Sequence, residues 1–254
     1  MRGARATVGL AVAIVLTATA TAATASADLL PSGAWNLNAS SGTLARDLSG
    51  HHNDGTLENG AKWTTGRFQG GASFDGVGAQ IRVPDAAALD AQNVTVSAWV
   101  NATAPGPFKY IVAKGANGCA ASSYGLYTGA NGGLQFYAST ALGSSWTLSP
   151  EATGSLWNGQ WHNIIGSFDG STVRLFVDGQ QVGTGTPDSS PIGYGLVTSN
   201  DLLIGNYAGC SGLDFPGKID EVKVFDRALS GNEIKWGYAI SRLLPSWTPF
   251  DLIL

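Results

Sequence analysis

Short runs of alternating apolar and polar residues, separated by Asp-Gly turns, dominate the middle of the chain. In residues 161–183, two Asp-Gly pairs divide three such runs, a pattern typical of an antiparallel meander. In the second run, Val173, Leu175 and Val177 share one face of a strand, and the residues between them take the other face. The pattern predicts a sheet with one side turned toward a core.

Similar segments follow one another along the chain. We expect strands, or the turns beside them, at residues 34–37, 44–50, 71–76, 80–83, 93–101, 109–114, 124–128, 133–139, 201–205 and 218–225. Their regular spacing predicts an all-β protein with two antiparallel sheets packed as a sandwich. We find no internal repeat and expect one domain.

One short helix is expected near the C-terminus, after Leu229. Ser230 and Glu233 have the spacing of a capping box. Ile234 and Tyr238 then form an apolar pair at positions i and i+4. We expect this helix to pack as a terminal plug on the sandwich.

The first 27 residues have the three parts of a secretory signal peptide. Two arginines precede an apolar run at residues 8–19, and residues 25–27 read Ala-Ser-Ala, a small-x-small cleavage signal. The apolar run is shorter than the roughly 20 residues of a membrane-spanning helix. We therefore expect cleavage after Ala27 and a secreted, extracellular protein with no membrane span. The expected domain covers residues 28–240, and a C-terminal tail covers residues 241–254.

Composition and charge exclude one class of partner. The chain has 35 glycines, 13% charged residues and a formal net charge of −4, which suits short strands joined by tight turns. No cluster of basic residues interrupts this balance. We therefore expect no binding to nucleic acid.

The chain has two cysteines, Cys119 and Cys210. Both lie in the part expected to be exported, where oxidising conditions favour pairing. A reactive thiol is the alternative, but neither cysteine has a histidine or a basic residue nearby in the sequence. We therefore predict one disulfide between them.

Four segments carry a pattern of their own. They are residues 47–57, residues 70–76, residues 94–100 together with the start of the meander, and residues 215–229. Jointly they resemble the laminin-G-like jelly-roll module of the concanavalin A-like lectin/glucanase superfamily, over about residues 33–240. The resemblance implies two curved antiparallel sheets whose concave face or rim loops bind a ligand. It does not decide between lectins, hydrolases and adhesion modules, because one fold hosts all three.

Catalysis of the glucanase type is not expected. The resemblance implies that such enzymes place acidic residues alternately along one strand, which directs all of them into one cleft. None of the four glutamates, at positions 58, 151, 221 and 233, has an aspartate two residues later. Asp220 and Glu221 are adjacent in a predicted strand and therefore point to opposite faces. For His162 we expect a hydrogen-bonded structural position.

The resemblance also implies a structural calcium ion between early and late strands, held by carboxylates and carbonyls. The matching positions are Asp220 in the last strand, Asp75 in a Phe-Asp-Gly turn and Asn38 after the first strand. Asn38 departs from the acidic residue usual at that place, which lowers the charge of the site. The alternative is an Asx turn in which Asp75 caps its own backbone.

A ligand site is expected near the two cysteines. Their bridge brings residues 115–124 beside residues 206–215. The candidate ligand-binding residues at this rim are Asn117, Tyr124, Asn206, Tyr207 and Asp214. Aromatic rings together with amide and carboxylate groups suit sugar recognition. The alternative is a stapled loop cluster whose polar contacts are purely structural.

The sequence therefore predicts a secreted, non-catalytic carbohydrate-binding module whose partner is a carbohydrate or a cell-surface glycan. An extracellular protein-binding adhesion or cell-surface interaction module is the second candidate. Exposed aromatic and amide side chains favour the first, whereas a broad apolar patch of several hundred Å² favours the second. A glycoside hydrolase is the third, and it requires paired carboxylates about 5–10 Å apart in a cleft.

Overall fold

The computed structural model describes residues 30–140 and 145–243. The chain divides into two units, Met1–Leu30 and Pro31–Leu254, and the second contains all the structure reported below. The predicted signal segment, residues 1–27, and residues 244–254 of the predicted tail lie outside the described residues.

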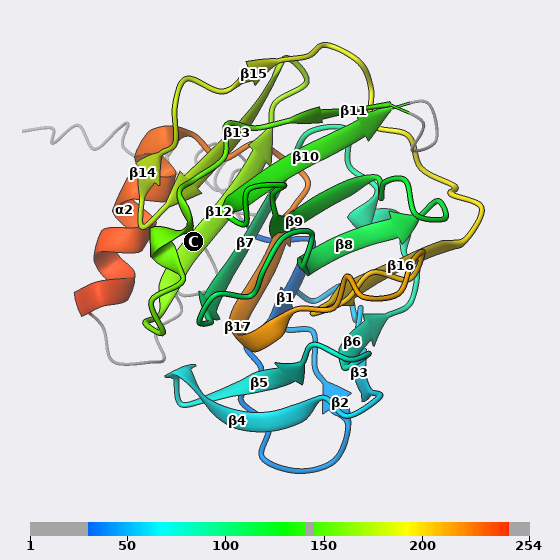
Figure 1. Ribbon diagram of the computed structural model, residues 1–254, viewed down its shortest axis with the longest axis vertical. Coiled ribbons are helices and arrows are strands. Elements are labelled where there is room, and N and C mark those ends of the chain that lie inside the picture. The colour runs from blue at the N-terminus through cyan, green and yellow to red at the C-terminus, as the bar shows by residue number, and fades with distance from the viewer. Residues whose placement is uncertain (1–29, 141–144, 244–254) are drawn as a thin grey trace, which may run out of the picture. The chain divides into compact units, whose positions relative to one another are not determined.

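Two antiparallel sheets form a sandwich, as predicted (Figure 1). The path of the nine-stranded sheet is β14 (Gln180–Gln181), β13 (Thr172–Val177), β12 (His162–Phe168), β7 (Val94–Asn101), β17 (Pro216–Phe225), β5 (Gly70–Asp75) and β4 (Lys62–Phe68). Beside this path, β1 (Gly33–Trp35) pairs with β17, and β15 (Thr186–Pro187) pairs with β13. The path of the eight-stranded sheet is β11 (Ser145–Leu148), β10 (Leu134–Thr140), β9 (Tyr124–Thr128), β8 (Tyr110–Ala116), β16 (Ser199–Ile204), β6 (Gln80–Val83), β3 (Gly55–Glu58) and β2 (Leu44–Ala45).

Alternating side chains of both sheets fill the space between them. In β7, Val94, Val96, Ala98 and Val100 are buried in one large core cluster, as the alternation predicts. Phe136 of β10 reaches this core from the other sheet and lies against Gly166 of β12. A Cβ atom at Gly166 would lie 2.1 Å from the Phe136 ring, so glycine is required where these two strands meet.

The predicted three-stranded meander is formed by β12, β13 and β14. Asp178 and Gly179 in the turn between β13 and β14 both have positive φ, at 51° and 75°, as a tight hairpin turn requires. Asp178 also accepts hydrogen bonds from the backbone N–H of Asn163 at 2.9 Å and contacts Nδ1 of His162 at 2.7 Å. The other ring nitrogen of His162 lies 3.2 Å from Oδ1 of Asn158. His162 therefore connects the turn to the loop before β12.

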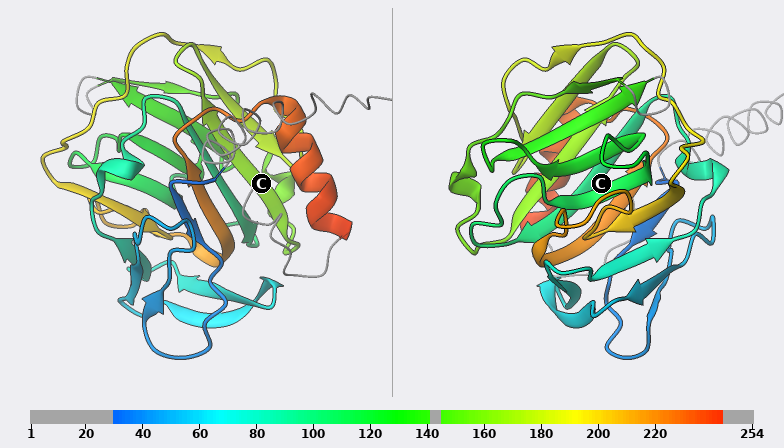
Figure 2. Two further views of the ribbon diagram at one scale, coloured as in Figure 1. Left: turned by 180° about the vertical axis from the view of Figure 1, so that it is seen from behind. Right: turned by 45° about the vertical axis from the view of Figure 1, so that its right-hand side comes forward.

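The predicted helix is α2 (Gly231–Leu243), which extends three residues into the predicted tail. Its capping box is formed: the N–H of Ser230 donates to Oε2 of Glu233 at 2.8 Å, and the N–H of Glu233 donates to Oγ of Ser230 at 3.2 Å. Ile234 packs with Ile165 and Phe176 on the outer face of the nine-stranded sheet (Figure 2). No helix within the described residues has the length and apolar character needed to cross a membrane.

Four strands were not expected from the sequence: β3, β15, β4 and β11. The last two lie at sheet edges and have no clean alternation of buried and exposed residues. Periodicity therefore gives no signal for them, because an edge strand has less burial to enforce a period of two. The described residues also form two short 3₁₀ helices, η1 (Ala87–Leu89) and η3 (Gly154–Leu156).

Candidate functional site

The predicted disulfide between Cys119 and Cys210 is present and spans 91 residues of sequence. Cys119 lies in the loop between β8 and β9, and Cys210 lies in the loop between β16 and β17. The bridge therefore holds together the two loops in which the ligand site was expected.

Four tyrosines gather beneath these loops on the outer face of the eight-stranded sheet. We call Tyr110, Tyr127, Tyr137 and Tyr207 the tyrosine cluster. Tyr207 from the disulfide-linked loop stacks on Tyr110 at 4.5 Å between ring centroids, and Tyr110 stacks on Tyr127 at 5.3 Å. Tyr137 meets both rings edge-on, and its hydroxyl donates to that of Tyr110 at 3.2 Å. Such stacked and edge-on pairs stabilise the packing beyond the area that they bury.

Burial keeps these hydroxyl groups protonated. Burial, the largest effect, raises the pKa of Tyr207 to about 12, and it also raises the pKa of Tyr110 and Tyr127. A phenol in this environment is neutral at physiological pH because its ionised form loses hydration. The cluster therefore offers hydroxyl donors and acceptors with no charge.

The structure places two of the predicted ligand residues in the interior. Tyr124 has 0% of its surface exposed, and its hydroxyl donates to the carbonyl of Leu89. It points between the sheets because it alternates along β9 with Tyr127 of the outer face. Tyr207 is 2% exposed and packs within the tyrosine cluster. Neither ring has an open face for a sugar in this structure.

The remaining predicted residues lie together near the disulfide, but contacts within the protein occupy them. Nδ2 of Asn206 donates to the carbonyl of Gly78 at 3.2 Å and to Oε1 of Gln80 at 3.0 Å. Asp214 is buried and forms a backbone bridge with Tyr110. Asn117 is half-buried, and its N–H donates to the hydroxyl of Tyr207. The contacts of the Asn206 side chain are structural ones, and ligand binding at the rim stays a prediction.

A more open aromatic surface adjoins the tyrosine cluster. Trp146 of the edge strand β11 is 46% exposed. Trp146 pairs with Ser139 of β10, and Leu148 pairs with Tyr137, two residues earlier in β10. Residues two apart on a strand share a face, so Trp146 lies on the same outer face as Tyr137. The sequence missed Trp146 because β11 is short, although its alternation with Leu148 was a usable signal.

Polar groups border the other side of this surface. Oε1 of Gln135 accepts a hydrogen bond from the Tyr127 hydroxyl at 3.2 Å, and Nε2 of Gln135 donates to the carbonyl of Ser149 at 3.0 Å. The carboxylate of Glu151 lies beside the Gln135 amide, since a Cβ atom at Gly129 would be 2.6 Å from both groups. Oε2 of Glu151 accepts from Nδ2 of the exposed Asn131 at 2.9 Å. We call Trp146, Tyr127, Gln135, Glu151 and Asn131 the outer aromatic face.

The three predicted calcium ligands do not form one site. Asp75 pairs with Pro216 across β5 and β17, whereas Asp220 lies four residues farther along β17. At about 3.3 Å per residue, this separates Asp75 and Asp220 by roughly 13 Å of strand. Oδ1 of Asp75 accepts from the N–H of Val77 at 2.8 Å, which is the Asx turn of the alternative. Within the described residues, no group of three or more His, Cys, Asp or Glu side chains is placed to hold a metal.

Asp220 instead has a structural environment. Its carboxylate is buried and accepts hydrogen bonds from the backbone N–H groups of Arg67, Phe68 and Glu221 at 2.8, 3.0 and 2.8 Å. Burial, the largest effect, raises the pKa of Asp220 to about 8, although the N–H donors oppose this. Asn38 uses its Oδ1 to accept from the N–H of Gly70 at 2.8 Å. Both side chains therefore fasten the β4–β5 hairpin.

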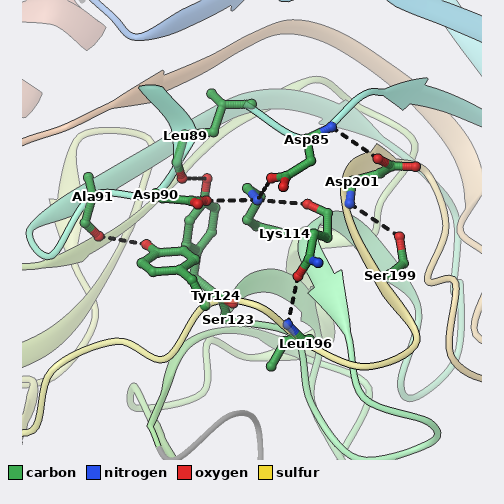
Figure 3. Close-up of polar contacts among 12 residues, drawn as sticks. Asp85, Leu89, Asp90, Ala91, Lys114, Ser123, Tyr124, Leu196, Ser199 and Asp201 are labelled. Atoms are coloured by element: carbon green, nitrogen blue, oxygen red, sulfur yellow. Dashed lines mark hydrogen bonds and ion pairs between the residues drawn. The ribbon is translucent and has the colours of Figure 1, made fainter. Parts of the chain in front are cut away.

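A buried ion-pair network lies at another end of the eight-stranded sheet (Figure 3). Lys114 of β8 points inward, and its Nζ lies 2.7 Å from Oδ1 of Asp85, 2.8 Å from Oδ1 of Asp90 and 2.7 Å from the carbonyl of Asn200. The contacts with Asp85 and Asn200 are hydrogen bonds, and the contact with Asp90 is an ion pair. The network therefore links β8 to the loop between β6 and β7 and to β16.

The fold has counterparts among solved structures. The chain superposes on domain 4 of an extracellular arabinanase from Geobacillus stearothermophilus, solved with arabinotriose, at a TM-score of 0.62 and 17% identity, covering 81% of this chain and 97% of that one. The binding domain of botulinum neurotoxin DC, solved with rat synaptotagmin II, superposes at a TM-score of 0.63 and 10% identity, covering 82% of this chain and 51% of the toxin domain. A Trypanosoma rangeli sialidase with the inhibitor DANA superposes at a TM-score of 0.55 and 18% identity, covering 81% of this chain and 32% of the sialidase. The chain thus spans about half of the toxin domain and a third of the sialidase.

The sequence comparison identifies the family. No match was found among curated proteins. A laminin-G family model, described as concanavalin A-like lectin/glucanases superfamily, matches residues 74–235. This range runs from β5 into α2 and contains both disulfide-linked loops and the tyrosine cluster. With more than half of the chain matched and the two-sheet sandwich in place, the chain belongs to the concanavalin A-like lectin/glucanase superfamily.

Proposed function

We propose that this chain is a secreted, non-catalytic module that binds carbohydrate through its outer aromatic face. The observation that carries the proposal is the position of Trp146, which is exposed on the same sheet face as Tyr127, Gln135 and Glu151. Sugar rings present apolar C–H groups to aromatic rings and hydroxyl groups to amides and carboxylates. Trp146 offers an exposed ring, and Asn131 and Glu151 offer an exposed amide and a half-buried carboxylate, whereas Tyr127 and Gln135 are buried beside them.

Secretion is supported by the features of the first 27 residues and by the disulfide between Cys119 and Cys210, since disulfides persist in oxidising compartments. The non-catalytic assignment is supported by the sequence, in which no glutamate is followed by an aspartate two residues later. The arabinanase domain, solved with arabinotriose, and the toxin binding domain are neighbours consistent with a binding role.

A protein-binding module is the second candidate, since the toxin binding domain was solved with synaptotagmin II. The exposed large apolar side chains do not favour it, because they come from separate strands, loops and α2. Within the described residues they are Leu30, Leu44, Val77, Phe108, Trp146, Val197 and Trp236. Many protein interfaces are marked by a broad apolar patch. Such a patch requires the exposed apolar residues to lie next to one another on neighbouring elements.

A panel of insoluble polysaccharides and a glycan array, both probed with the secreted chain, test the proposal. We expect saturable retention on at least one carbohydrate and no release of reducing sugar from it. Retention on none of them contradicts carbohydrate binding, and steady release of reducing sugar contradicts the non-catalytic assignment.

A further inference from the structure

The helix α2 contacts the sandwich through one of its faces. Ile234 of α2 is 1% exposed and packs with Ile165 and Phe176 of the nine-stranded sheet. One turn later, Tyr238 stacks on Trp99 of β7 with 6.0 Å between the ring centroids. Because residues at positions i and i+4 share one side of a helix, these contacts define the inner face of α2.

The opposite face of α2 is apolar as well. At about 100° of rotation per residue, Trp236, Ala239 and Ile240 lie on the side of α2 away from its inner face. Trp236 is 68% exposed, Ala239 is exposed and Ile240 is half-buried. We call these three residues the outer helix face. A helix that is apolar on all sides is typical of the interior of a protein, so the outer helix face is expected to have an occupant.

Residues 244–254, which follow α2 in the sequence, have the composition of such an occupant. We call them the C-terminal segment. Asp251 is the one charged residue among them, whereas a segment that stays in water is typically rich in charged residues and poor in aromatic ones. Its large apolar side chains are those of Leu244, Trp247, Phe250, Leu252, Ile253 and Leu254. The C-terminal segment therefore has apolar surface to bury, and the outer helix face adjoins it in the chain.

The C-terminal segment is long enough to return along α2. The 13 residues of α2 span about 20 Å, whereas the segment reaches about 36 Å when extended. Pro245 disfavours a continued helix, because proline lacks the N–H group and its ring clashes with the preceding turn. If a turn at Pro245 brings Trp247 level with Leu243, Phe250 comes level with Trp236, since three extended residues and seven helical residues both cover about 10 Å.

We propose that the C-terminal segment folds back over the outer helix face of its own chain and covers it, with Phe250 against Trp236. The covalent link favours docking within one chain, because it holds the segment near this surface at an effective concentration on the order of millimolar. The outer helix face belongs to the helix on the nine-stranded sheet, whereas the outer aromatic face lies on the eight-stranded sheet. The inference is therefore independent of the proposed carbohydrate function.

The rate at which chymotrypsin cleaves the full chain after Phe250, followed by mass spectrometry, tests the proposal. The protease cleaves the undocked form, so the rate reports how much of the segment is free. We expect cleavage about tenfold slower or more than in a synthetic peptide of residues 244–254. Trp236→Ser should raise the rate about fivefold, whereas Trp236→Leu keeps an apolar side chain and should stay within about twofold of the wild type. Val197→Ser is the control, because Val197 is 84% exposed in the loop before β16, and equal melting temperatures exclude misfolding as the cause.

Cleavage of the full chain as fast as the peptide overturns the inference and leaves the outer helix face to a partner outside the chain. Equal rates in Trp236→Ser and the wild type also overturn it, because the segment is then protected at another place. Protection that grows with protein concentration, together with a dimer in sedimentation velocity, indicates the segment of a second copy and overturns docking within one chain. None of these results changes the retention of the chain on carbohydrate, which tests the proposed function separately.

Discussion

Lys114 forms a 2.8 Å ion pair with Asp90 while only 2% of its own side chain is exposed. Asp90 is more open, with 30% of its side chain exposed. The ammonium group thus lies inside the sandwich, and its carboxylate partners lie near the surface. Because a buried charge without a partner is costly, this pair fixes the position of the loop between β6 and β7.

We expect Lys114→Met to destabilise the fold although methionine fits the same space. Removing the ammonium group leaves the carboxylates of Asp85 and Asp90 beside each other without their cation. Breaking a fully buried pair costs about 3–5 kcal/mol, and the exposure of the two aspartates reduces this to about 2–3 kcal/mol. Urea unfolding measures the loss, with Lys235→Met on the exposed side of α2 as the control. A loss below about 1 kcal/mol, within the range of surface substitutions, would show that the network is not structural.

The free energy of unfolding is expected to fall as pH rises between the pKa of Asp220 in the unfolded chain and its pKa in the folded protein. The pKa of this carboxyl is raised by burial to about 8 in the folded protein, against roughly 3.9 in an unfolded chain. Between these values the folded protein retains a proton that the unfolded chain has released, so each higher pH unit lowers the free energy of unfolding by about 1 kcal/mol. Asp220→Asn carries no such proton. Urea unfolding from pH 5 to pH 8 in EDTA should therefore show the wild type losing stability relative to the variant, and a constant difference would contradict the raised pKa.

Calcium is expected to leave the melting temperature unchanged. Asp75 caps its own turn, and Asp220 accepts three backbone N–H groups at a distant position along β17. An ion bound to the folded state alone would raise the melting temperature as its concentration rises. Calorimetric scans with calcium and with chelator measure this. A rise with calcium that Asp220→Asn abolishes would restore the binding that the family resemblance implies.

Trp146→Ala is expected to weaken carbohydrate binding without affecting the fold. Its ring is largely exposed at the edge strand β11, so its removal costs a ligand contact and little packing. We expect a loss of about fivefold to tenfold in affinity for whichever polysaccharide is retained, in line with about 1 kcal/mol for an aromatic contact. Trp236→Ala is the matched control, because Trp236 is 68% exposed on α2 and lies outside the outer aromatic face. Equal losses in the two variants would remove the outer aromatic face as the binding surface.

Features that depend on neighbouring residues were available from the sequence. The alternation in β7 and β13 determined which side chains face the core, because successive residues of a strand point to opposite faces. The capping box of Ser230 and Glu233 set the start of α2 through hydrogen bonds three residues apart. The pairing of Cys119 with Cys210 followed from their number and the expected compartment.

Only the tertiary structure decided the sites. Tyr124 and Tyr127 lie in one strand, yet one is in the core and the other on the outer face, since strand register assigns each position to a side. Register also separates Asp75 from Asp220, which the sequence had assigned to one ion. Arg67 meets Trp99, and Trp99 meets Tyr238, because β4 and β7 belong to the same sheet and α2 packs on its outer face. Contacts between such distant segments depend on packing and sheet order, which local patterns do not encode.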